Sequence, residues 1–328
     1  RSRSDYLCVS THVPLNCYPN CNSSTLNCSH WFAFMNEQGL VVARFRRHVS
    51  VQDRNEKRYM CQMQRRGLQP VVGDKVEWQR TSHKSGTVTK ILPRDVELAQ
   101  LNARGGAEVI TANLSQLVIT LAHEPKPDWF AIDRYLCAAE LIHTKSLIVL
   151  NKKDLNPDPP AVLREYENIG YPVYQISAKK GTGLEPLAHD MENNRSIIVG
   201  QSGVGKSSLL NALIGDALQA VAHLSEKTTQ GRHTTTTSMM YQLPKGGQLI
   251  DSPGVRDYTP YIEKPELIQI GFREFSVYKD KCRFRNCIHQ AEPECGIKQA
   301  ITKGKISERR YDSYKKLYKL TKEIIRST

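Results

Sequence analysis

The chain has 328 residues, and its content of 39% hydrophobic and 24% charged residues excludes a wholly disordered or collagen-like protein. Lysine and arginine outnumber aspartate and glutamate by 46 to 33, a net charge of +13 that favours polyanionic partners such as nucleic acid; a merely basic soluble protein is the alternative. No apolar run reaches the roughly eighteen residues of a membrane span. The start shows no secretory signal, so we expect a cytoplasmic protein without membrane contact.

Residues 1–36 are rich in serine, asparagine, threonine and cysteine, and they show no sustained periodicity. We expect them to form a poorly ordered extension. The four cysteines in this segment could hold a metal ion, but their spacing matches no common zinc knuckle. The chain has nine cysteines in all, and this odd number fits a disulfide framework poorly.

Residues 37–104 contain short segments of strand-like composition with no helical pattern between them. These segments are 39–45, 57–63, 71–78 and 86–92. Such spacing predicts a small five-stranded barrel of the oligonucleotide-binding (OB) type. Phe45, Tyr59 and Trp78 lie among many arginines, so the barrel could stack bases and follow phosphates. The alternative is that these aromatic side chains form only the core of the barrel.

A glycine-rich stretch, 102–107, reads as a linker, and residues 105–260 then alternate between strand and helix patterns. The predicted strands are 114–121, 146–150, 172–176, 196–199 and 248–251, and the predicted helices are 129–143 and 206–214. Short apolar runs of this kind are typical of strands that a parallel sheet buries on both faces. The pattern therefore predicts a doubly wound α/β domain.

A phosphate-binding loop (P-loop) pattern lies between the strand at 196–199 and the helix that begins at Lys206. Its glycines allow successive amide hydrogens to face phosphate oxygens, and the helix N-terminus adds positive potential. Lys206 is expected to reach the β and γ phosphates, and Ser207 to bind Mg²⁺. The predicted nucleotide-binding residues here are Gly200, Gln201, Ser202, Gly203, Val204, Gly205, Lys206, Ser207 and Ser208.

The sequence Asp251-Ser-Pro-Gly254 ends the next apolar run. An aspartate at the carboxyl end of a strand beside the P-loop suits water-mediated binding of Mg²⁺. Gly254 would let the backbone approach the γ-phosphate. The pattern is short, and its position after the P-loop is what makes it informative.

Two further loops follow predicted strands and suit recognition of guanine. Asp154 can accept hydrogen bonds from guanine N1 and N2, which adenine cannot offer, so the wrong base would leave buried polar groups unpaired. The predicted base-binding residues are Asn151, Lys152 and Asp154 in the first loop, and Ser177, Ala178 and Lys179 in the second. Each loop alone is weak evidence; both together with a P-loop predict a GTP or GDP site.

Residues 261–328 turn helical and basic, and they begin with a tight cluster of cysteines and histidine. Cys282, Cys287, His289 and Cys295 would supply three thiolates and one imidazole. This is a closed tetrahedral set, which predicts one Zn²⁺ ion that is structural rather than catalytic, because no coordination position stays open. The apolar stripe of the last helix is expected to pack on the chain's own domain.

These segments resemble the five motifs of a guanine-nucleotide-binding domain, but the base-reading motifs precede the P-loop. That order is the mark of the circularly permuted GTPases. With a barrel before the domain and a zinc knuckle after it, the chain resembles the bacterial ribosome small subunit-dependent GTPase A (RsgA/YjeQ) family. The likeness runs from Gly39 to the C-terminus.

The resemblance implies a GTPase stimulated by the small (30S) ribosomal subunit that acts in late subunit maturation. We expect a monomer that binds ribosomal RNA through the barrel and the zinc domain, with Mg²⁺ bound together with GTP. The resemblance also implies that Thr235 of the first switch binds Mg²⁺. Val255 stands where many GTPases have a water-orienting glutamine, so the resemblance assigns catalysis to His233.

Two alternatives remain open at this stage. The first is a permuted GTPase that assembles a different ribosomal particle, which the barrel and knuckle argue against. The second is an RNA-binding scaffold whose nucleotide site acts as a switch without appreciable catalysis. The missing glutamine keeps this second alternative open.

Overall fold

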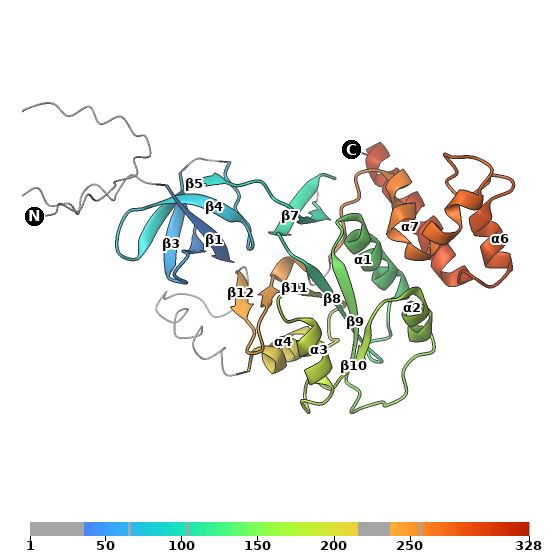
Figure 1. The fold of residues 1–328 in the computed structure, drawn as a ribbon, viewed down its shortest axis with the longest axis horizontal. Helices are drawn as coiled ribbons and strands as arrows, with labels where there is room; N and C mark the ends of the chain where they lie inside the picture. The colour runs from blue at the N-terminus through green and yellow to red at the C-terminus, as the bar shows by residue number, and fades with distance from the viewer. Residues whose placement is uncertain (1–35, 65–66, 103–104, 216–236, 256–257, 328) are drawn as a thin grey trace, which may run out of the picture.

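The computed structural model describes residues 36–64, 67–102, 105–215, 237–255 and 258–327. Almost all of the predicted N-terminal extension therefore lies outside the described residues. Figure 1 shows three parts along the long axis: a barrel at one end, an α/β region in the middle and a helical region at the other end. None of the described helices is long and apolar enough to cross a membrane.

The N-terminal part is a closed five-stranded barrel, which confirms the predicted fold. Its strands are β1 (Glu37–Arg44), β2 (Val49–Gln52), β3 (Arg58–Met63), β4 (Lys75–Arg80) and β5 (Ser85–Ile91). Strand β1 pairs with β2 and β4, β3 pairs with β2 and β5, and the pairing of β4 with β5 closes the barrel. A closed sheet leaves no unpaired strand edges.

The barrel core decides between the two interpretations of its aromatic residues. Trp78 is fully buried and Tyr59 is 1% exposed, with their ring centroids 4.7 Å apart. Gly86 gives the indole its space, because a Cβ there would lie 2.5 Å from the Trp78 ring. Tyr59 and Trp78 are therefore core residues and cannot stack on bases, whereas Phe45 is half-buried.

The stretch predicted as a linker is instead the turn of a hairpin, so that prediction was wrong. Strands β6 (Glu97–Leu101) and β7 (Ala107–Ala112) pair antiparallel in a separate sheet. The hairpin is also hydrogen-bonded to the chain at the end of the α/β region. Leu101 N donates to Thr259 O at 3.0 Å, and Tyr261 N donates to Ala99 O at 3.0 Å. A glycine-rich turn within a hairpin has the same composition as a linker, and only the pairing distinguishes them.

The middle part is the predicted doubly wound sheet. Its strands are β8 (Gln116–Ala122), β9 (Lys145–Asn151), β10 (Val173–Gln175), β11 (Arg195–Val199), β12 (Ser238–Gln242) and β13 (Gln248–Asp251). They lie in the order β10-β9-β8-β11-β13-β12, and all are parallel except β12. Strand β12 also pairs with β1 of the barrel, so one continuous sheet runs through both parts.

Helices cover both faces of this sheet. They are α1 (Trp129–Leu141), α2 (Leu163–Ile169), α3 (Leu184–Asp190) and α4 (Lys206–Ile214). Leu117 and Ile119 of β8 join a core with α1 and α2, whereas Val118 joins a second core with α3 and α4. Alternate side chains of a strand thus fill opposite cores, which explains why these strands are apolar throughout.

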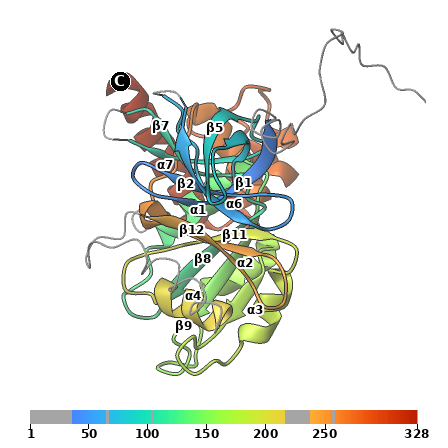
Figure 2. The ribbon, with the colours of Figure 1, turned by 90° about the vertical axis from the view of Figure 1, so that its left-hand side faces the viewer.

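The C-terminal part packs on α1, at the end of the molecule opposite the barrel (Figure 1). It contains short 3₁₀ segments η3 (Pro265–Gly271), η4 (Arg273–Val277) and η5 (Lys279–Lys281), followed by α6 (Gly296–Thr302) and α7 (Glu308–Ser327); η2 (Pro253–Val255) precedes it. Viewed along the long axis, the α/β sheet extends below the barrel and the C-terminal helices (Figure 2). Tyr314, Leu317 and Tyr318 are buried, which confirms that the predicted stripe docks on the chain itself.

A buried ion-pair network joins α7 to α1. Arg310 is fully buried; its guanidinium donates to Asp133 Oδ1 at 2.7 Å and to both carboxylate oxygens of Glu274 at 2.8 and 3.0 Å. The neighbouring Arg309 donates to Asp133 Oδ2 at 2.8 Å, and Tyr166 donates its hydroxyl to Asp133 Oδ1. Removing one member of such a network leaves an uncompensated buried charge.

Replacing Arg310 with methionine is expected to lower the free energy of unfolding by about 3–5 kcal/mol, because the buried Glu274 carboxylate loses its cation and Asp133 loses one of its two. Urea unfolding followed by far-UV circular dichroism measures the change. Lys245→Met removes the exposed pair of Lys245 with Glu185 and serves as the control, with an expected loss below about 1 kcal/mol. Equal effects of the two substitutions would contradict this assignment.

Candidate nucleotide site and metal centre

The predicted nucleotide-binding loops meet at one edge of the sheet. Strands β9, β8, β11 and β13 are neighbours and parallel, so the segments that follow them leave the same edge. The P-loop follows β11, the Asn151 loop follows β9, and Asp251 ends β13. Ligands of open α/β sheets bind at the carboxyl ends of the strands, and this edge is such a place.

Two glycines of the P-loop have conformations that other residues rarely adopt. Gly200 has φ +144°, and a Cβ there would lie 2.1 Å from Thr120 O. Gly205 has φ +94°, and a Cβ there would lie 2.4 Å from the Asn151 side-chain nitrogen. Helix α4 begins directly after Gly205, so its first amide groups face the loop.

The ammonium group of Lys206 is hydrogen-bonded to two carbonyl oxygens of the P-loop. It donates to Gly200 O at 2.6 Å and to Gln201 O at 2.7 Å. These two carbonyl oxygens hold the positive charge beside the N-terminus of α4, which adds its own partial positive charge. This arrangement creates a local positive potential that suits a phosphate group.

Asn151 connects three loops through a single amide group. Its Nδ2 donates to Val204 O in the P-loop at 3.0 Å, and its Oδ1 accepts from Ala178 N at 3.0 Å. The residue is 2% exposed, so both bonds are shielded from water. Asn151 was predicted as a nucleotide-binding residue, and in the structure it joins the P-loop to the two loops predicted to read the base.

Asp154 lies beside the second base-reading loop. Ser177 Oγ donates to Asp154 Oδ1 at 2.5 Å, and this hydrogen bond lowers the pKa of the carboxyl group. Ser177 Oγ in turn accepts from Lys180 N at 3.1 Å. Asp154 is therefore ionised at neutral pH and can only accept hydrogen bonds, as recognition of guanine N1 and N2 requires.

Two lysines of the base-reading loops have different positions. Lys152, at φ +66°, donates its ammonium to Glu124 O at 2.7 Å, which draws the loop after β9 toward the loop after β8. The side chain of Lys179 is exposed. Both were predicted as nucleotide-binding residues. Of the two, Lys152 is the one whose side chain forms a hydrogen bond between two loops of the site.

The residues predicted to handle Mg²⁺ lie together in part. Ser207 and Asp251 line one small cavity with Lys206 and Ser252. Gly254 follows in the 3₁₀ segment η2, and Val255 is 3% exposed. Thr235 and His233 lie outside the described residues. Because Val255 is buried and apolar, it cannot orient a water molecule.

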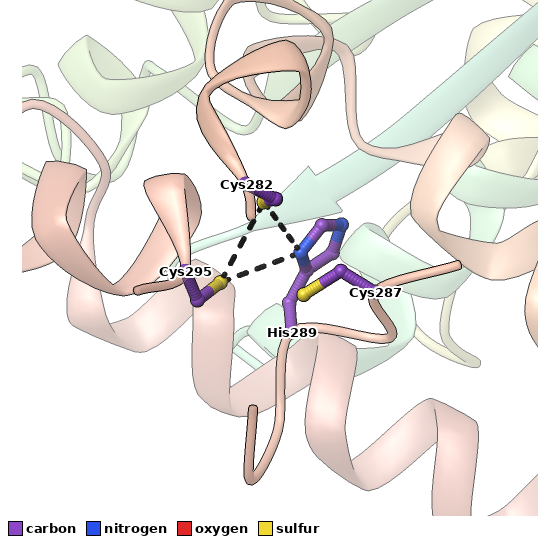
Figure 3. Close-up of side chains that lie close together, drawn as sticks. All are labelled: Cys282, Cys287, His289 and Cys295. Atoms are coloured by element: carbon purple, nitrogen blue, oxygen red, sulfur yellow. Dashed lines mark hydrogen bonds between the residues drawn. The ribbon is translucent and has the colours of Figure 1, made fainter. Parts of the chain in front are cut away.

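The four predicted metal ligands converge in the C-terminal part (Figure 3). The Nδ1 atom of His289 lies 3.5 Å from the sulfur of Cys282 and 3.5 Å from that of Cys295, and the two sulfurs are 3.9 Å apart. A tetrahedral zinc ion with Zn–S near 2.3 Å and Zn–N near 2.0 Å requires about 3.8 Å between sulfurs and about 3.5 Å from sulfur to nitrogen. The donor set therefore fits a metal ion of this kind.

Neighbouring groups orient the ligands. His289 Nε2 lies 3.0 Å from Gln269 Oε1, so the amide oxygen accepts the Nε2 proton and leaves the Nδ1 lone pair facing the sulfurs. Gly296 N donates to the sulfur of Cys282 at 3.3 Å. Sequence reasoning missed Gln269, because it lies twenty residues before the histidine and no spacing pattern connects them.

Burial determines the charge state of the cluster without a cation. It lowers the pKa of His289, which keeps the imidazole neutral, and raises the pKa of Cys287 to about 12. Burial also raises the pKa of Cys295. Buried thiols of this kind become thiolates only beside a compensating positive charge, and a coordinated metal ion supplies one.

Three comparisons relate the chain to known proteins. Residues 91–260 match the family described as RsgA GTPase. Proteins named small ribosomal subunit biogenesis GTPase RsgA, from Haemophilus influenzae and Actinobacillus pleuropneumoniae, are each 39% identical over 290 residues, covering 86% of this chain and 84% of the relative.

Solved structures give the same result. The crystal structure of YjeQ from Thermotoga maritima is 30% identical with a TM-score of 0.68, covering 88% of this chain and 99% of that one. The structure of YloQ, a circularly permuted GTPase, is 26% identical with a TM-score of 0.67, covering 89% of this chain and 96% of that one.

Replacing Cys287 with alanine is expected to remove most of the bound metal and to loosen the C-terminal part, because three ligands hold zinc less well than four. Metal per chain, measured by inductively coupled plasma mass spectrometry, is expected to fall from about one zinc to near zero. Cys137→Ala, which removes a buried thiol outside the cluster, is the matched control and should keep its metal. Unchanged zinc in Cys287→Ala would refute the assignment.

Proposed function

The chain belongs to the RsgA family of circularly permuted GTPases, and from this premise we propose that the small ribosomal subunit stimulates its hydrolysis of GTP. That the chain is a GTPase follows from its family. The proposal adds that it acts in late maturation of the 30S subunit. The relatives are named for small-subunit biogenesis, and this chain covers most of their length.

The arrangement around Asn151 supports the nucleotide-binding part of this proposal most directly. One buried amide holds the P-loop against the loops that would read the base, in a sheet whose motif order is permuted. We assign base recognition to Asp154 and phosphate binding to Lys206. The other proposed contacts come from the remaining loop residues named above: Lys152, Ser177, Ala178, Lys179, Gly200–Gly205, Ser208 and Gly254.

Magnesium would be held by Ser207 directly, by Asp251 through water, and by Thr235 in the GTP state. Such an ion supplies charge that stabilises the phosphate oxygens during phosphoryl transfer. Ser207 and Asp251 already line one cavity with Lys206. Their hydroxyl and carboxylate oxygens are the hard donors that Mg²⁺ prefers.

We assign orientation of the attacking water to His233. Val255 occupies the position where many GTPases have glutamine, and it is buried and apolar. Another side chain must therefore perform this task, and the first switch supplies the histidine. We also assign the metal as one structural Zn²⁺ ion, since all four coordination positions are filled by the protein.

We propose that the barrel and the C-terminal domain both bind ribosomal RNA. Arg46, Arg47, Arg54 and Lys57 are exposed on the barrel, so its contribution is contact with phosphates. The two parts lie at opposite ends of the molecule, which would let a monomer contact two separate regions of the subunit (Figure 1). We also propose that the protein acts in the cytoplasm, since its proposed partner is ribosomal. The proposed domains are the barrel at 37–104, the GTPase domain at 105–260 and the zinc and helical domain at 261–328.

Replacing His233 with alanine is expected to lower subunit-stimulated GTP turnover by about 10²-fold or more, because positioned acid–base and water-orienting groups contribute factors of that size. Single-turnover hydrolysis at saturating small subunits measures the effect, with GDP affinity as a check that the site is intact. His189→Ala, at an exposed histidine outside the loops, is the control. Equal stimulated rates would remove His233 from the mechanism, and no stimulation of the wild type would favour an RNA-binding scaffold.

A further inference from the structure

A cavity of about 600 Å³ opens to the surface beside the metal cluster. Two large apolar side chains on its walls are unusually accessible: Ile270 is 57% exposed and Phe284 is 41% exposed. The metal ligands Cys282, Cys287 and His289 are among its lining residues. The cluster therefore fixes the shape of the cavity, because Phe284 lies between two ligands in the chain.

The charge around the cavity is mainly positive. Lys279 and Arg285 line it, and among the described residues neither forms an ion pair. Asp280 is the one carboxylate among the lining residues. Arg283 lies 5.5 Å from the Phe284 ring centroid, but its guanidinium is paired with Glu294 at 2.5 Å. Two cations thus remain available beside an accessible aromatic ring.

A ligand that fits these features must have a flat apolar face and a negative charge close to it. An unpaired nucleotide has both: its base can stack on Phe284 and pack against Ile270, while Lys279 and Arg285 contact the adjoining phosphates. The volume lies within the range of ordinary small-ligand sites. A flat duplex surface would leave the cavity unfilled, because the bases of a duplex are stacked on one another.

We propose that this cavity binds a single unpaired nucleotide of RNA, with Phe284 as the stacking platform. The proposal rests on the ribosomal RNA partner proposed above and names where, and in what form, the C-terminal domain recognises it. It also assigns to the metal cluster a role beyond stability, because three of its ligands line the binding cavity.

The test uses the full chain and two probes: purified small subunits, and a short single-stranded RNA that carries the fluorescent base 2-aminopurine. Stacking on Phe284 is expected to quench the fluorescence. Phe284→Ala is expected to weaken binding of both probes by about 5- to 150-fold, the range for one base–aromatic stack. Arg285→Gln should lower the slope of log affinity against log salt by about 0.7 for the single strand.

Val277→Ala is the matched control, since Val277 is 64% exposed but lies outside this cavity. It should bind both probes as the wild type does, and all variants should keep their zinc. If Phe284→Ala binds both probes with wild-type affinity, the cavity assignment is overturned and the proposed function is unaffected. Weaker subunit binding with unchanged RNA quenching would assign Phe284 to a protein contact and overturn it too. Failure of the wild type to bind small subunits would instead refute the proposed function.

Discussion

The nucleotide site depends on one buried amide group. Asn151 holds the P-loop at Val204 and the second base-reading loop at Ala178, so three loops from three strands form one surface. Gly205 must lack a side chain because the Asn151 amide occupies that space. Ser177, next to Ala178, then fixes the Asp154 carboxylate. The loops proposed to bind the base and the phosphates are thus joined by the two hydrogen bonds of Asn151, which are shielded from water.

Helix α1 connects this site to the C-terminal domain. Its first turn lies against the P-loop, because Asp128 N donates to Gln201 Oε1 at 3.1 Å and Asp128 caps the helix by accepting from Ala131 N. Further along the same helix, Asp133 accepts from Arg309 and Arg310 of α7. On the other side of the sheet, β12 pairs with both β13 and β1, which attaches the barrel. The permuted chain order places an RNA-binding candidate on each side of the nucleotide domain.

The sequence predicted what local patterns specify. The helix at 206–214 and the strand at 248–251 have the predicted bounds, because a P-loop and a buried apolar run ending in aspartate have few alternative structures. Strand β2 was missed because it is only four residues long, and the β6–β7 turn was read as a linker because its glycines suit both. Contacts between distant segments could not be predicted from the sequence. Examples are Gln269 beside His289, the Arg310 network, and the burial of Tyr59 and Trp78, all of which depend on how these segments pack.

The most direct test of the central claim, that these loops form a guanine-nucleotide site, is the nucleotide specificity of Asp154→Asn measured by calorimetry with GDP and xanthosine diphosphate. Xanthine has a carbonyl oxygen where guanine has its amino group, so an asparagine amide can donate to it while a carboxylate cannot. The account predicts that the wild type prefers GDP and that Asp154→Asn prefers xanthosine diphosphate. Unchanged preference for GDP in the variant would contradict it, because Asp154 would then not contact the base.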